Sequence, residues 1–444
     1  MKRYEKYKPS GVEWLGEVPE HWEVKPLKFL TTKIVDGSHF TPTYIDTGVP
    51  FLRVTDIQNN DINMENIKYI PQEEHLELVK RCNPEKGDLL LSKNGTIGVT
   101  KVIDWNWEFS IFVSLCLIKF NTKINSTFAH YVFESHSLQE QIFGLTKKNT
   151  VTNLHLDKIR EFWFIVPTLN EQLGIINFLD KKTEKIDRLI SRQQALLEKL
   201  SEKRTALITE TVCGRVRLPT ALNDNETLSS NVPLRNSGIE WLGEVPEHWE
   251  IKPLKFAVSY NDETLPENTD LDEEILYVDI SSVSLTDGIK NKELMIFENA
   301  PSRARRIVKD GDVLVSTVRT YLKAIAQVES AEPNLIASTG FAVLRSKCGL
   351  NSQYLGYYIQ SEGIVGAIVA NSVGVSYPAI NASDLVRLPI CIPSETEQTI
   401  IANYLDKKTE KINHLQNKIE RVIERLKEYR SALITQVVTG KVKV

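Results

Sequence analysis

The sequence predicts an α+β protein in which two pseudo-symmetric lobes are separated by two long antiparallel helices that form a coiled coil. Three observations lead to this fold class. Blocks of sequence recur at offsets of 226 and 227 residues, two segments carry a seven-residue apolar repeat, and short β-like runs alternate with helical segments in the lobes. The predicted order is one lobe, one helix, a second lobe and a second helix.

The composition is that of a globular protein with more than one domain. The chain has 444 residues, of which 41% are hydrophobic and 25% are charged. The N-terminal MKRYEKYKPSG lacks the apolar stretch of a signal peptide, and no run approaches the ~20 apolar residues that span a bilayer. We therefore expect a cytoplasmic protein with no membrane partner.

The five cysteines argue against a disulfide framework and a structural zinc site, because they are odd in number, far apart and without a CxxC pair. We expect no bound metal, and reduced thiols that lie mostly in the core. The cysteines are Cys82, Cys116, Cys213, Cys348 and Cys391.

The net charge of −4 gives no general basic surface of the kind that nucleic-acid-binding domains often carry. The charge is unevenly distributed. Residues 1–170 carry 20 basic and 21 acidic side chains, residues 171–217 carry 10 and 7, residues 231–396 carry 14 and 22, and residues 397–444 carry 10 and 6. Any DNA-binding surface must therefore be local.

An internal repeat is the strongest signal in the sequence. Residues 10–29, SGVEWLGEVPEHWEVKPLKF, recur 227 residues later with 18 of 20 positions identical. Further matching pairs begin at Glu171 and Glu397 and at Arg204 and Arg430. Between these blocks the halves diverge and keep only a skeleton, such as GDLLLS against GDVLVS. Gene duplication with neutral drift is the alternative, but two recognition surfaces on one frame better explain why the ends are kept and the middles differ.

Two segments of about 40 residues carry the heptad pattern of a coiled coil. Each ends at a glycine, Gly214 or Gly440, which is typical of a helix stop. At ~1.5 Å per residue each helix would be roughly 60 Å long. The predicted packing residues are Leu179, Ile186, Leu189, Leu196, Leu200 and Leu207 in the first helix, and Leu405, Ile412, Leu415, Ile419, Val422, Leu426, Tyr429 and Leu433 in the second.

The helices should be antiparallel, because each follows its own lobe in the same order and a pseudo-two-fold axis would relate the halves. The alternative is that each helix packs back on its own lobe, but the apolar stripe continues beyond one lobe's width. The predicted domains are the N-terminal lobe (1–170), the first helix (171–217), a polar linker (218–234), the C-terminal lobe (235–396) and the second helix with its tail (397–444).

Loops rich in Gly, Ser, Thr, Asn and basic residues interrupt the β-like runs of both lobes. Such loops suit DNA reading, because amides, hydroxyls and basic side chains bind phosphates while Asn and Arg form paired bonds to base edges. For any single loop the alternative is an ordinary solvated turn. The candidate DNA-binding residues are Ser38, His39, Thr41, Arg53, Lys93, Asn94, Thr96, Lys147, Lys148, Asn149 and Asn153 in the first lobe, and Arg303, Arg305, Arg306, Arg319, Lys323, Asn371, Ser372, Tyr377 and Asn381 in the second.

Sequence motifs for catalysis are missing from the chain. It contains no GxxxxGK[ST] phosphate loop, no glycine-rich dinucleotide motif, no HExxH metal helix and no Asn-Pro-Pro-aromatic segment of an adenine methyltransferase. We therefore predict no catalytic residues, with an unrecognised nuclease site as the alternative. His39 is interpreted as a turn residue rather than a metal ligand.

The WLGEVPEHW blocks, the divergent lobes and the VP-then-EQ and IP-then-EQ segments before the long helices together resemble the specificity subunit of type I restriction-modification systems. The resemblance covers nearly the whole chain. In the first lobe DGSHFTP, FLRVTDI and GDLLLSKNGTIG resemble segments of that family's target-recognition domains. The second lobe departs from the pattern, with TVRTYLK in place of the NGTIG loop.

The resemblance implies two target-recognition domains that each read half of an asymmetric, interrupted DNA site, with the helices as a ruler. It implies two modification subunits as partners, which methylate adenine with S-adenosylmethionine, and commonly restriction subunits that use ATP and Mg²⁺. This chain would be non-catalytic and hold no cofactor. Replacing Arg303, Arg305 and Arg306 by alanine should then affect only one half-site.

Three other classes of protein stay open at this point. A coiled-coil scaffold with two protein-binding lobes would show no nucleic-acid affinity in its assembled complex. A specificity protein without a restriction partner would be recognised from its neighbouring genes. A stand-alone DNA-modifying enzyme would methylate or cut DNA unaided.

Overall fold

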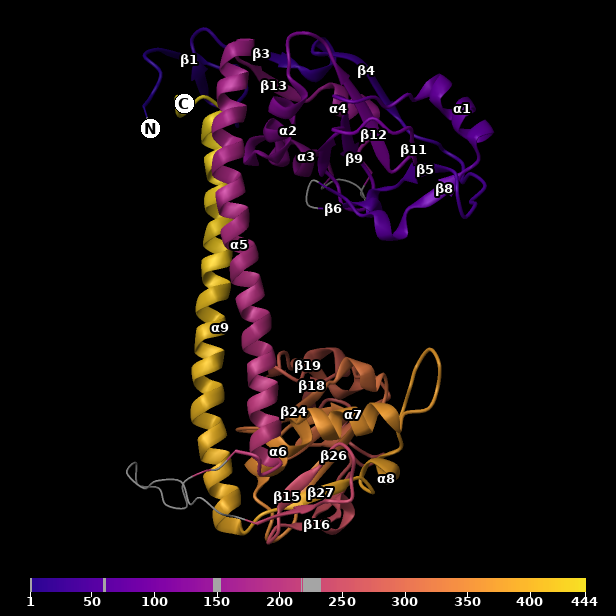
Figure 1. Cartoon of the computed structure of the whole chain (residues 1–444), viewed down its shortest axis with the longest axis vertical. Coiled ribbons are helices and arrows are strands. Elements are labelled where there is room, and N and C mark those ends of the chain that lie inside the picture. The colour runs from indigo at the N-terminus through magenta and orange to yellow at the C-terminus, as the bar shows by residue number, and fades with distance from the viewer. Residues whose placement is uncertain (1, 59–60, 147–152, 217, 219–232) are drawn as a thin grey trace. The chain divides into compact units, whose positions relative to one another are not determined.

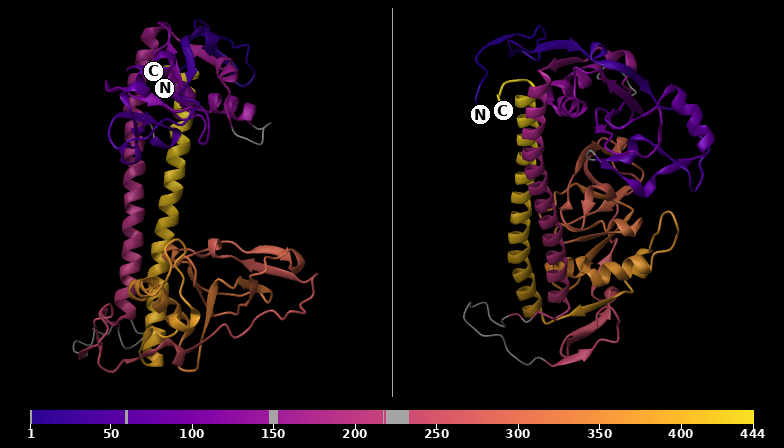
Figure 2. Two further views of the ribbon diagram at one scale, coloured as in Figure 1. Left: turned by 90° about the vertical axis from the view of Figure 1, so that its right-hand side faces the viewer. Right: turned by 45° about the horizontal axis from the view of Figure 1, so that its top comes forward.

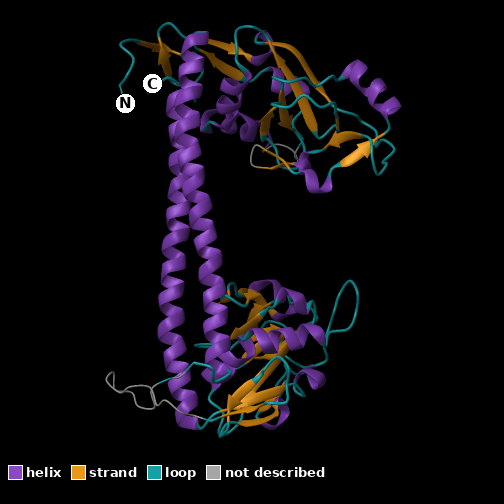
Figure 3. Ribbon diagram, in the orientation of Figure 1, coloured by secondary structure: helices purple, strands orange, loops and turns teal. Residues whose placement is uncertain are grey.

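The computed structural model describes residues 2–58, 61–146, 153–216, 218 and 233–444. The chain divides into two compact units, unit 1 (residues 1–193 with 421–444) and unit 2 (residues 194–420) (Figure 1). Each unit contains a lobe of strands and short helices together with part of both long helices (Figure 3). Most of the predicted linker lies outside the described residues.

Unit 1 is built around a four-stranded antiparallel sheet of order β10-β9-β12-β4 and a three-stranded sheet of order β11-β5-β8, in which β11 and β5 are parallel. Its strands are β1 (Tyr7–Pro9), β2 (Glu17–Pro19), β3 (Glu23–Pro26), β4 (Thr31–Asp36), β5 (Val49–Leu52), β6 (Ile57–Gln58), β7 (Asp61–Ile62), β8 (Lys68–Ile70), β9 (Leu89–Ser92), β10 (Thr100–Val102), β11 (Ser110–Ile111), β12 (Leu115–Phe120) and β13 (Trp163–Val166). Its short helices are α1 (Gln72–Arg81), α2 (Ser126–Glu134), α3 (His136–Thr146) and α4 (Leu156–Arg160).

Unit 2 repeats this plan with the sheet order β17-β26-β23-β24 and a parallel pair, β18 with β25. Its strands are β14 (Leu234–Asn236), β15 (Glu244–Pro246), β16 (Glu250–Pro253), β17 (Val258–Tyr260), β18 (Glu274–Val278), β19 (Val283–Ser284), β20 (Gly288–Ile289), β21 (Glu293–Ile296), β22 (Ala304–Ile307), β23 (Val313–Ser316), β24 (Ile325–Gln327), β25 (Leu335–Ser338), β26 (Phe341–Ser346) and β27 (Pro389–Ile392). Its short helices are α6 (Ser352–Gln360), α7 (Glu362–Ala370) and α8 (Ala382–Leu385). The matching sheets confirm the predicted pseudo-symmetry.

The central strand of each main sheet is buried on both faces, which explains its uninterrupted apolar run. Side chains of a strand alternate between faces, so Leu89 and Leu91 of β9 join one core cluster while Leu90 joins another. In β23, Val313 and Leu314 divide in the same way. The GDLLLS and GDVLVS runs are therefore the shared frame on which both lobes are built.

The two long helices, α5 (Leu169–Val212) and α9 (Glu395–Val438), have 44 residues each and pack in antiparallel order. In unit 1 the first part of α5 meets the last part of α9, where Ile186 and Leu433 share one core cluster. In unit 2 the last part of α5 meets the first part of α9, and Gln416 Nε2 donates to Ser201 Oγ at 3.0 Å. Figure 1 shows α5 beside α9. The predicted coiled coil is confirmed.

One of the two predicted packing rows is wrong. The row that contains Leu179 and Leu405 is buried or half-buried along its length. The residues of the other predicted row are between 42% and 54% exposed, and they are Leu189, Leu196, Leu415, Val422 and Tyr429. The second row that is buried or half-buried instead contains Thr183, Ile190, Leu197 and Arg204 in α5, and Thr409, Gln416, Ile423 and Arg430 in α9. Polar residues at five of these eight positions hid the row from a search for apolar side chains.

Each long helix begins in a reciprocal cap that the repeat supplies twice. Thr168 Oγ1 donates to Glu171 Oε2 at 2.7 Å, and the Glu171 amide donates to Thr168 Oγ1 at 3.4 Å. Ser394 and Glu397 form the same contacts at the start of α9. The VP-then-EQ and IP-then-EQ segments therefore form the N-terminal caps of α5 and α9.

The near-identical WLGEVPEHW blocks form sockets for the ends of the long helices. Trp22 Nε1 donates to Glu171 at the start of α5, at 3.1 Å. The end of α9 also reaches this socket, because Gly440 has a left-handed φ of +71° and lies directly against Pro19 and Trp22. Both views of Figure 2 show the two ends of the chain side by side, where Lys2 bridges Lys443. Two helix ends in one socket explain why this block is kept in both halves.

Replacing Gly440 by alanine should destabilise unit 1 through two effects. A left-handed Cβ costs about 1–2 kcal/mol. The new Cβ would also lie 2.4 Å from Pro19 Cδ, and such overpacking adds about 1–3 kcal/mol. The matched control is Gly11→Ala, at φ +79° with no described atom within 4 Å of a Cβ, which should show the first effect alone. Urea unfolding of both variants measures the difference, and equal losses would contradict the socket.

Candidate nucleic-acid interface

Two predicted loops of the first lobe meet at a buried ion pair. Asp36 and Lys93 are 4% and 5% exposed, and Lys93 Nζ contacts Asp36 Oδ2 at 3.0 Å. The Lys93 carbonyl also accepts the Leu154 amide at 2.8 Å, which brings in the segment after residue 152. Lys93 is therefore a correction to the predicted contact residues: because its ammonium is buried and paired, it positions the loops instead of facing solvent.

Asn94 and Asn153 lie together on these converging loops. They form an isolated antiparallel bridge, and both are half-buried. Within the part of the chain that the structure describes, the buried Oδ1 of each has no hydrogen-bond partner. A buried acceptor without a donor is costly, and an incoming amino group would relieve that cost. Paired amides of this kind suit the N6 and N7 edge of adenine.

The other predicted residues of the first lobe differ in availability. Ser38 is buried and donates to the Phe40 carbonyl at 2.7 Å, so it shapes its own turn. Arg53 donates to Asp56 Oδ1 at 2.9 Å and stays 27% exposed. His39, Thr41 and Thr96 are exposed. Lys147, Lys148 and Asn149 lie outside the described residues.

Arg81 belongs to this surface, although sequence reasoning missed it. It lies at the end of α1, forms an ion pair with Asp36 and donates to the Gly37 carbonyl at 3.2 Å. Its side chain is still 52% exposed. Arg81 precedes Gly87 by the same number of residues as Arg305 precedes Gly311. Aligning the two lobes on the GDLLLS frame would have revealed it.

The second lobe builds the same junction from different side chains. Val318 and Ala379 form the bridge that Asn94 and Asn153 form in the first lobe. The Ile380 amide donates to the Thr317 carbonyl at 2.9 Å, as Leu154 does to Lys93. The backbone arrangement is therefore shared, while paired amides in one lobe are replaced by apolar groups in the other.

An arginine and a tyrosine stack beside this junction in the second lobe. The Arg319 guanidinium lies 4.7 Å from the centre of the Tyr377 ring. Thr320 and Ser372 join the two loops through their hydroxyl oxygens, which are 2.7 Å apart. Arg319 adopts a left-handed φ of +49°, which is uncommon for a residue with a side chain and marks a constrained turn. Tyr377 is 65% exposed, so the stack is open to a ligand.

Three further predicted residues flank the stack. Lys323 is exposed and, like Arg319, has a left-handed φ, of +52°. Asn371 Nδ2 donates to the Ala367 carbonyl at 2.8 Å, and Asn381 Nδ2 donates to Asp384 Oδ2 at 3.2 Å. These two amides therefore keep their carbonyl oxygens for other contacts.

The predicted SRARR loop is instead a strand, which corrects the sequence interpretation. Ala304–Ile307 forms the edge strand β22, and its register shifts between Ala304 and Arg306, so Arg305 is the extra residue of a bulge. The bulge places Arg305 over the Phe297 ring, 4.7 Å from its centre. Arg303 is the most exposed of the three, with 57% of its side chain accessible.

Arg306 is held differently from its neighbours. Its Nε is buried and has no hydrogen-bond partner in the described chain, and burial lowers the pKa of its guanidinium. Because a bulge re-aims side chains along a strand, the three arginines of residues 303–306 face three different environments. Arg303 is therefore the best placed of the three for a ligand.

The described residues contain neither a helix that is long and apolar enough to cross a membrane nor a cluster of three metal-binding side chains. Four of the cysteines are buried and Cys348 is exposed, in agreement with the predicted core positions.

Comparison with known proteins agrees with this arrangement. Residues 19–199 and 261–425 match the family model described as type I restriction modification DNA specificity domain. The putative type I restriction enzyme MjaX specificity subunit of Methanocaldococcus jannaschii is 24% identical over 97% of this chain and 96% of its own length. The putative specificity subunit S.HindORF215P of Haemophilus influenzae is 24% identical over 46% of this chain and 50% of its own length.

A solved structure supports the fold independently. It comes from work on the structural basis of complex assembly and conformational transition of the type I R-M system, and it matches with a TM-score of 0.66 at 16% identity. The match covers 96% of this chain and 99% of the solved chain. Because the family match covers most of both lobes and both long helices, this chain belongs to the type I restriction-modification DNA specificity family and is a specificity subunit with two target-recognition domains.

Proposed function

We propose that each lobe reads one half of an asymmetric, interrupted DNA site through its loop junction. One observation carries the proposal: an identical backbone bridge holds Asn94 and Asn153 in the first lobe but Val318 and Ala379 in the second. Amides form paired hydrogen bonds to adenine, whereas apolar groups contact the methyl group of thymine. A shared frame with different base-facing chemistry is what two different half-sites require.

Basic side chains around each junction would provide phosphate contacts that fix the register on the duplex. Arg81 and His39 would do this for the first lobe. Arg303, Arg319 and Lys323 would do so for the second. The buried members of the predicted set, Lys93 among them, would act by holding the loops in place.

The chain would work within a complex. We propose two modification subunits as partners, which would use S-adenosylmethionine to methylate adenine, and restriction subunits that would use ATP and Mg²⁺. No cofactor would bind this chain. The partners would also supply phosphate contacts, which would compensate for the 22 acidic against 14 basic residues in 231–396. Acting on cellular DNA, the complex would be cytoplasmic, and the length of α5 and α9 would set the spacing of the half-sites.

Single-molecule methylation mapping tests the proposal. DNA from cells that carry this chain with its neighbouring modification subunit is compared with DNA from cells that lack this chain. We expect a chain-dependent methyladenine mark in an interrupted two-part motif. If both proteins are expressed and associated but no mark appears, the scaffold function would become the better explanation.

Substitutions at the two junctions should act on separate half-sites. Replacing Asn94 and Asn153 by alanine should relax one half of the motif, while Arg319→Ala should affect the other. A lost base contact costs about 1–3 kcal/mol, or roughly tenfold to a hundredfold in discrimination. Methylation mapping of each variant reads both halves at once. A change in both halves from either variant would contradict independent reading.

Replacing all three of Arg303, Arg305 and Arg306 by alanine does not separate a loss of DNA contact from a loss of structure. Arg305 and Arg306 are built into β22, so their loss would also disturb the lobe. Arg303→Ala alone should weaken the half-site that Arg319→Ala affects. Unchanged binding and unchanged methylation specificity would exclude a contact role for Arg303.

A further inference from the structure

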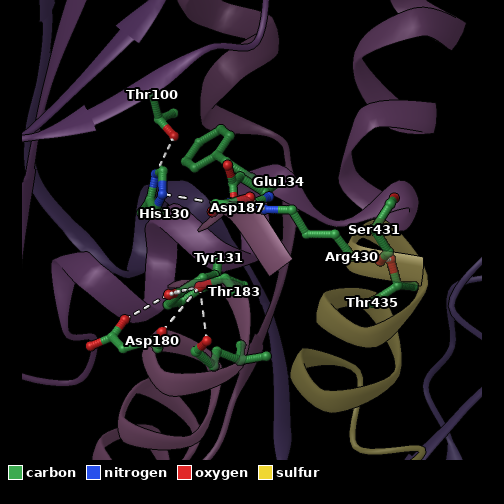
Figure 4. Close-up of polar contacts among 12 residues, drawn as sticks. Thr100, His130, Tyr131, Glu134, Asp180, Thr183, Asp187, Arg430, Ser431 and Thr435 are labelled. Carbon is green, nitrogen blue, oxygen red and sulfur yellow. Dashed lines mark hydrogen bonds and ion pairs between the residues drawn. The ribbon is translucent and has the colours of Figure 1, made fainter. Parts of the chain in front are cut away.

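A half-buried arginine of α9 is paired with two carboxylates in unit 1. Arg430 Nε contacts Asp187 Oδ1 at 2.9 Å, and its Nη1 contacts Glu134 Oε2 at 3.1 Å (Figure 4). Burial lowers the pKa of Arg430, but the two carboxylates outweigh burial and raise it overall. His130 lies behind the cluster, with its Nε2 3.8 Å from Glu134. The charge of this arginine is therefore compensated inside the chain.

The repeat places Arg204 of α5 at the equivalent position in unit 2, 226 residues earlier. Both of its expected partners are replaced by neutral amides. Gln360 stands where Glu134 stands in unit 1, and Asn413 stands where Asp187 stands. The substitutions remove both negative charges and keep the size of each side chain.

Hydrogen bonds close to Arg430 in unit 1 recur close to Arg204 in unit 2, so the backbone around the two arginines has the same arrangement. Tyr357 donates to Asp406 Oδ1 at 2.7 Å, and Tyr131 donates to Asp180 Oδ1 at 2.6 Å. The backbone amides of the residues that follow Ser135 at the end of α2 and Ser361 at the end of α6 also form matching hydrogen bonds. The Glu362 amide donates to Thr209 Oγ1, and the His136 amide donates to Thr435 Oγ1, both at 2.9 Å.

Arg204 is left without a partner in this conserved frame. Its side chain is 9% exposed, and its Nε and the Oε1 of Gln360 are buried without hydrogen bonds among the described residues. Burial lowers the pKa of Arg204, and the opposing electrostatic effects of Tyr357 and Asp287 do not offset it. Because an arginine stays charged in a protein, a buried Nε–H group without an acceptor carries a desolvation cost that a carboxylate would offset. We therefore expect Arg204 to bind an anionic group that is supplied by another molecule.

A cavity of about 1350 Å³ lies beside Arg204 and reaches Gln360 and Asn413. In unit 2 the position of His130 is occupied by Gly356, and the side chain of Gln327, which also lines the cavity, lies directly against this glycine. The lining carries both charges. Besides Arg204 it includes the basic residues Lys292 and Lys411 and the acidic residues Asp287, Glu329, Asp406 and Glu410.

We propose that this cavity binds the carboxylate of an Asp or Glu side chain from a modification subunit, which pairs with Arg204 as Glu134 and Asp187 pair with Arg430. The inference rests on the proposed function, because it takes the modification subunit as the partner. In unit 1 the equivalent arginine, Arg430, pairs with carboxylates, which are therefore the expected ligand of Arg204. A DNA backbone fits poorly, since its repeated phosphates would face the four carboxylates of the lining.

A mixed-charge protein segment meets these requirements better. Its acidic side chain would pair with Arg204, and flanking lysines or arginines would face Asp287, Glu329 and Glu410. Unit 1 closes the equivalent site with its own side chains and has no need of such a segment. The two halves of the specificity subunit would therefore offer unequal surfaces to two copies of one partner.

Exchanging the side chains between the two units tests this proposal in the full-length chain. The closed variant carries Gln360→Glu and Asn413→Asp, which gives Arg204 the partners that Arg430 has. The mirror variant carries Glu134→Gln and Asp187→Asn, and it is the matched control. Stepwise binding of the neighbouring modification subunit is measured by calorimetry, and unfolding temperature is measured for each chain.

We expect the closed variant to weaken one of the two binding steps by about tenfold or more, while its unfolding temperature is equal to or above that of the wild type. The mirror variant should leave that step unchanged. Wild-type affinity in the closed variant would overturn the inference, because Arg204 would then need only an internal partner.

Arg204→Met provides a second variant if the closed chain fails to fold. It removes the charge, keeps the length of the side chain and should weaken the same binding step, and an unchanged step would overturn the inference. Methylation mapping separates the two levels of failure. An interrupted mark with unaltered binding in the variants would reject only the carboxylate site, whereas no mark from the wild-type pair would reject the proposed function as well.

Discussion

Replacing Trp22 by alanine will lower the free energy of unfolding of unit 1 by about 3–5 kcal/mol. Trp22 is fully buried, at 0% exposure, and packs against Gly440 at the end of α9. Its Nε1 also donates to Glu171, which caps the start of α5. The substitution therefore leaves a large cavity at the point where both long helices are anchored.

Urea unfolding followed by hydrogen exchange measures the loss and locates it. Exchange should rise in unit 1, including the first turns of α5 and the last turns of α9. The control is Trp163→Ala, since Trp163 is 40% exposed and should cost far less. Trp249→Ala should reproduce the loss in unit 2, because Trp249 packs against Gly214 and donates to Glu397. A loss below about 1 kcal/mol for Trp22→Ala would show that the socket does not anchor the helices.

The repeat explains why so much of the fold could be predicted from the sequence. Residues that anchor a helix end must be the same wherever that anchor is used, so Trp22 with Pro19 and Trp249 with Pro246 lie against equivalent glycines. The glycine stops at Gly214 and Gly440 follow from the left-handed turn that each helix end adopts. Because each helix anchor is built twice in the same chain, its residues appear in the sequence as a repeat.

The second packing row shows where that pattern becomes unreliable. A search for apolar residues selected Leu189 and Leu196, which are exposed, because the true row contains Thr183 and Arg204. Thr183 bonds the Leu179 carbonyl at 2.8 Å, so it can be buried within a helix. A buried polar residue is recognised only when its partner is known, and the partner lies on another element.

The same reason limits prediction of the site. Lys93 lies in a loop of polar residues, and its burial depends on Asp36, which is 57 residues away in sequence. The bulge that re-aims Arg305 depends on the register of β22 with β25. The sequence could assign the candidate DNA-binding loops to the divergent segments, but it could not decide which of their side chains face solvent.

Replacing Asp36 by asparagine will destabilise unit 1 by about 3–5 kcal/mol, because it leaves Lys93 buried without a countercharge. It will also release Arg81 and His39, which both contact Asp36. Reading of one half-site should fail as the loops separate. Urea unfolding measures the first effect and methylation mapping the second. Asp157→Asn, at an exposed position, is the control.

The pH dependence of stability provides a sharper test of the same contact. Burial raises the pKa of Asp36, but hydrogen bonds from Lys93 and His39 more than offset it, so the pKa lies below its ordinary value. The contribution to stability is therefore complete above about pH 4, where an unfolded aspartate is ionised, and is lost as the pH falls through the lower folded pKa. Asp36→Asn should flatten this acid loss. If the variant keeps the full acid dependence of the wild type, the stability that depends on pH comes from other carboxylates, and the Asp36 to Lys93 pair is not what holds the recognition loops together.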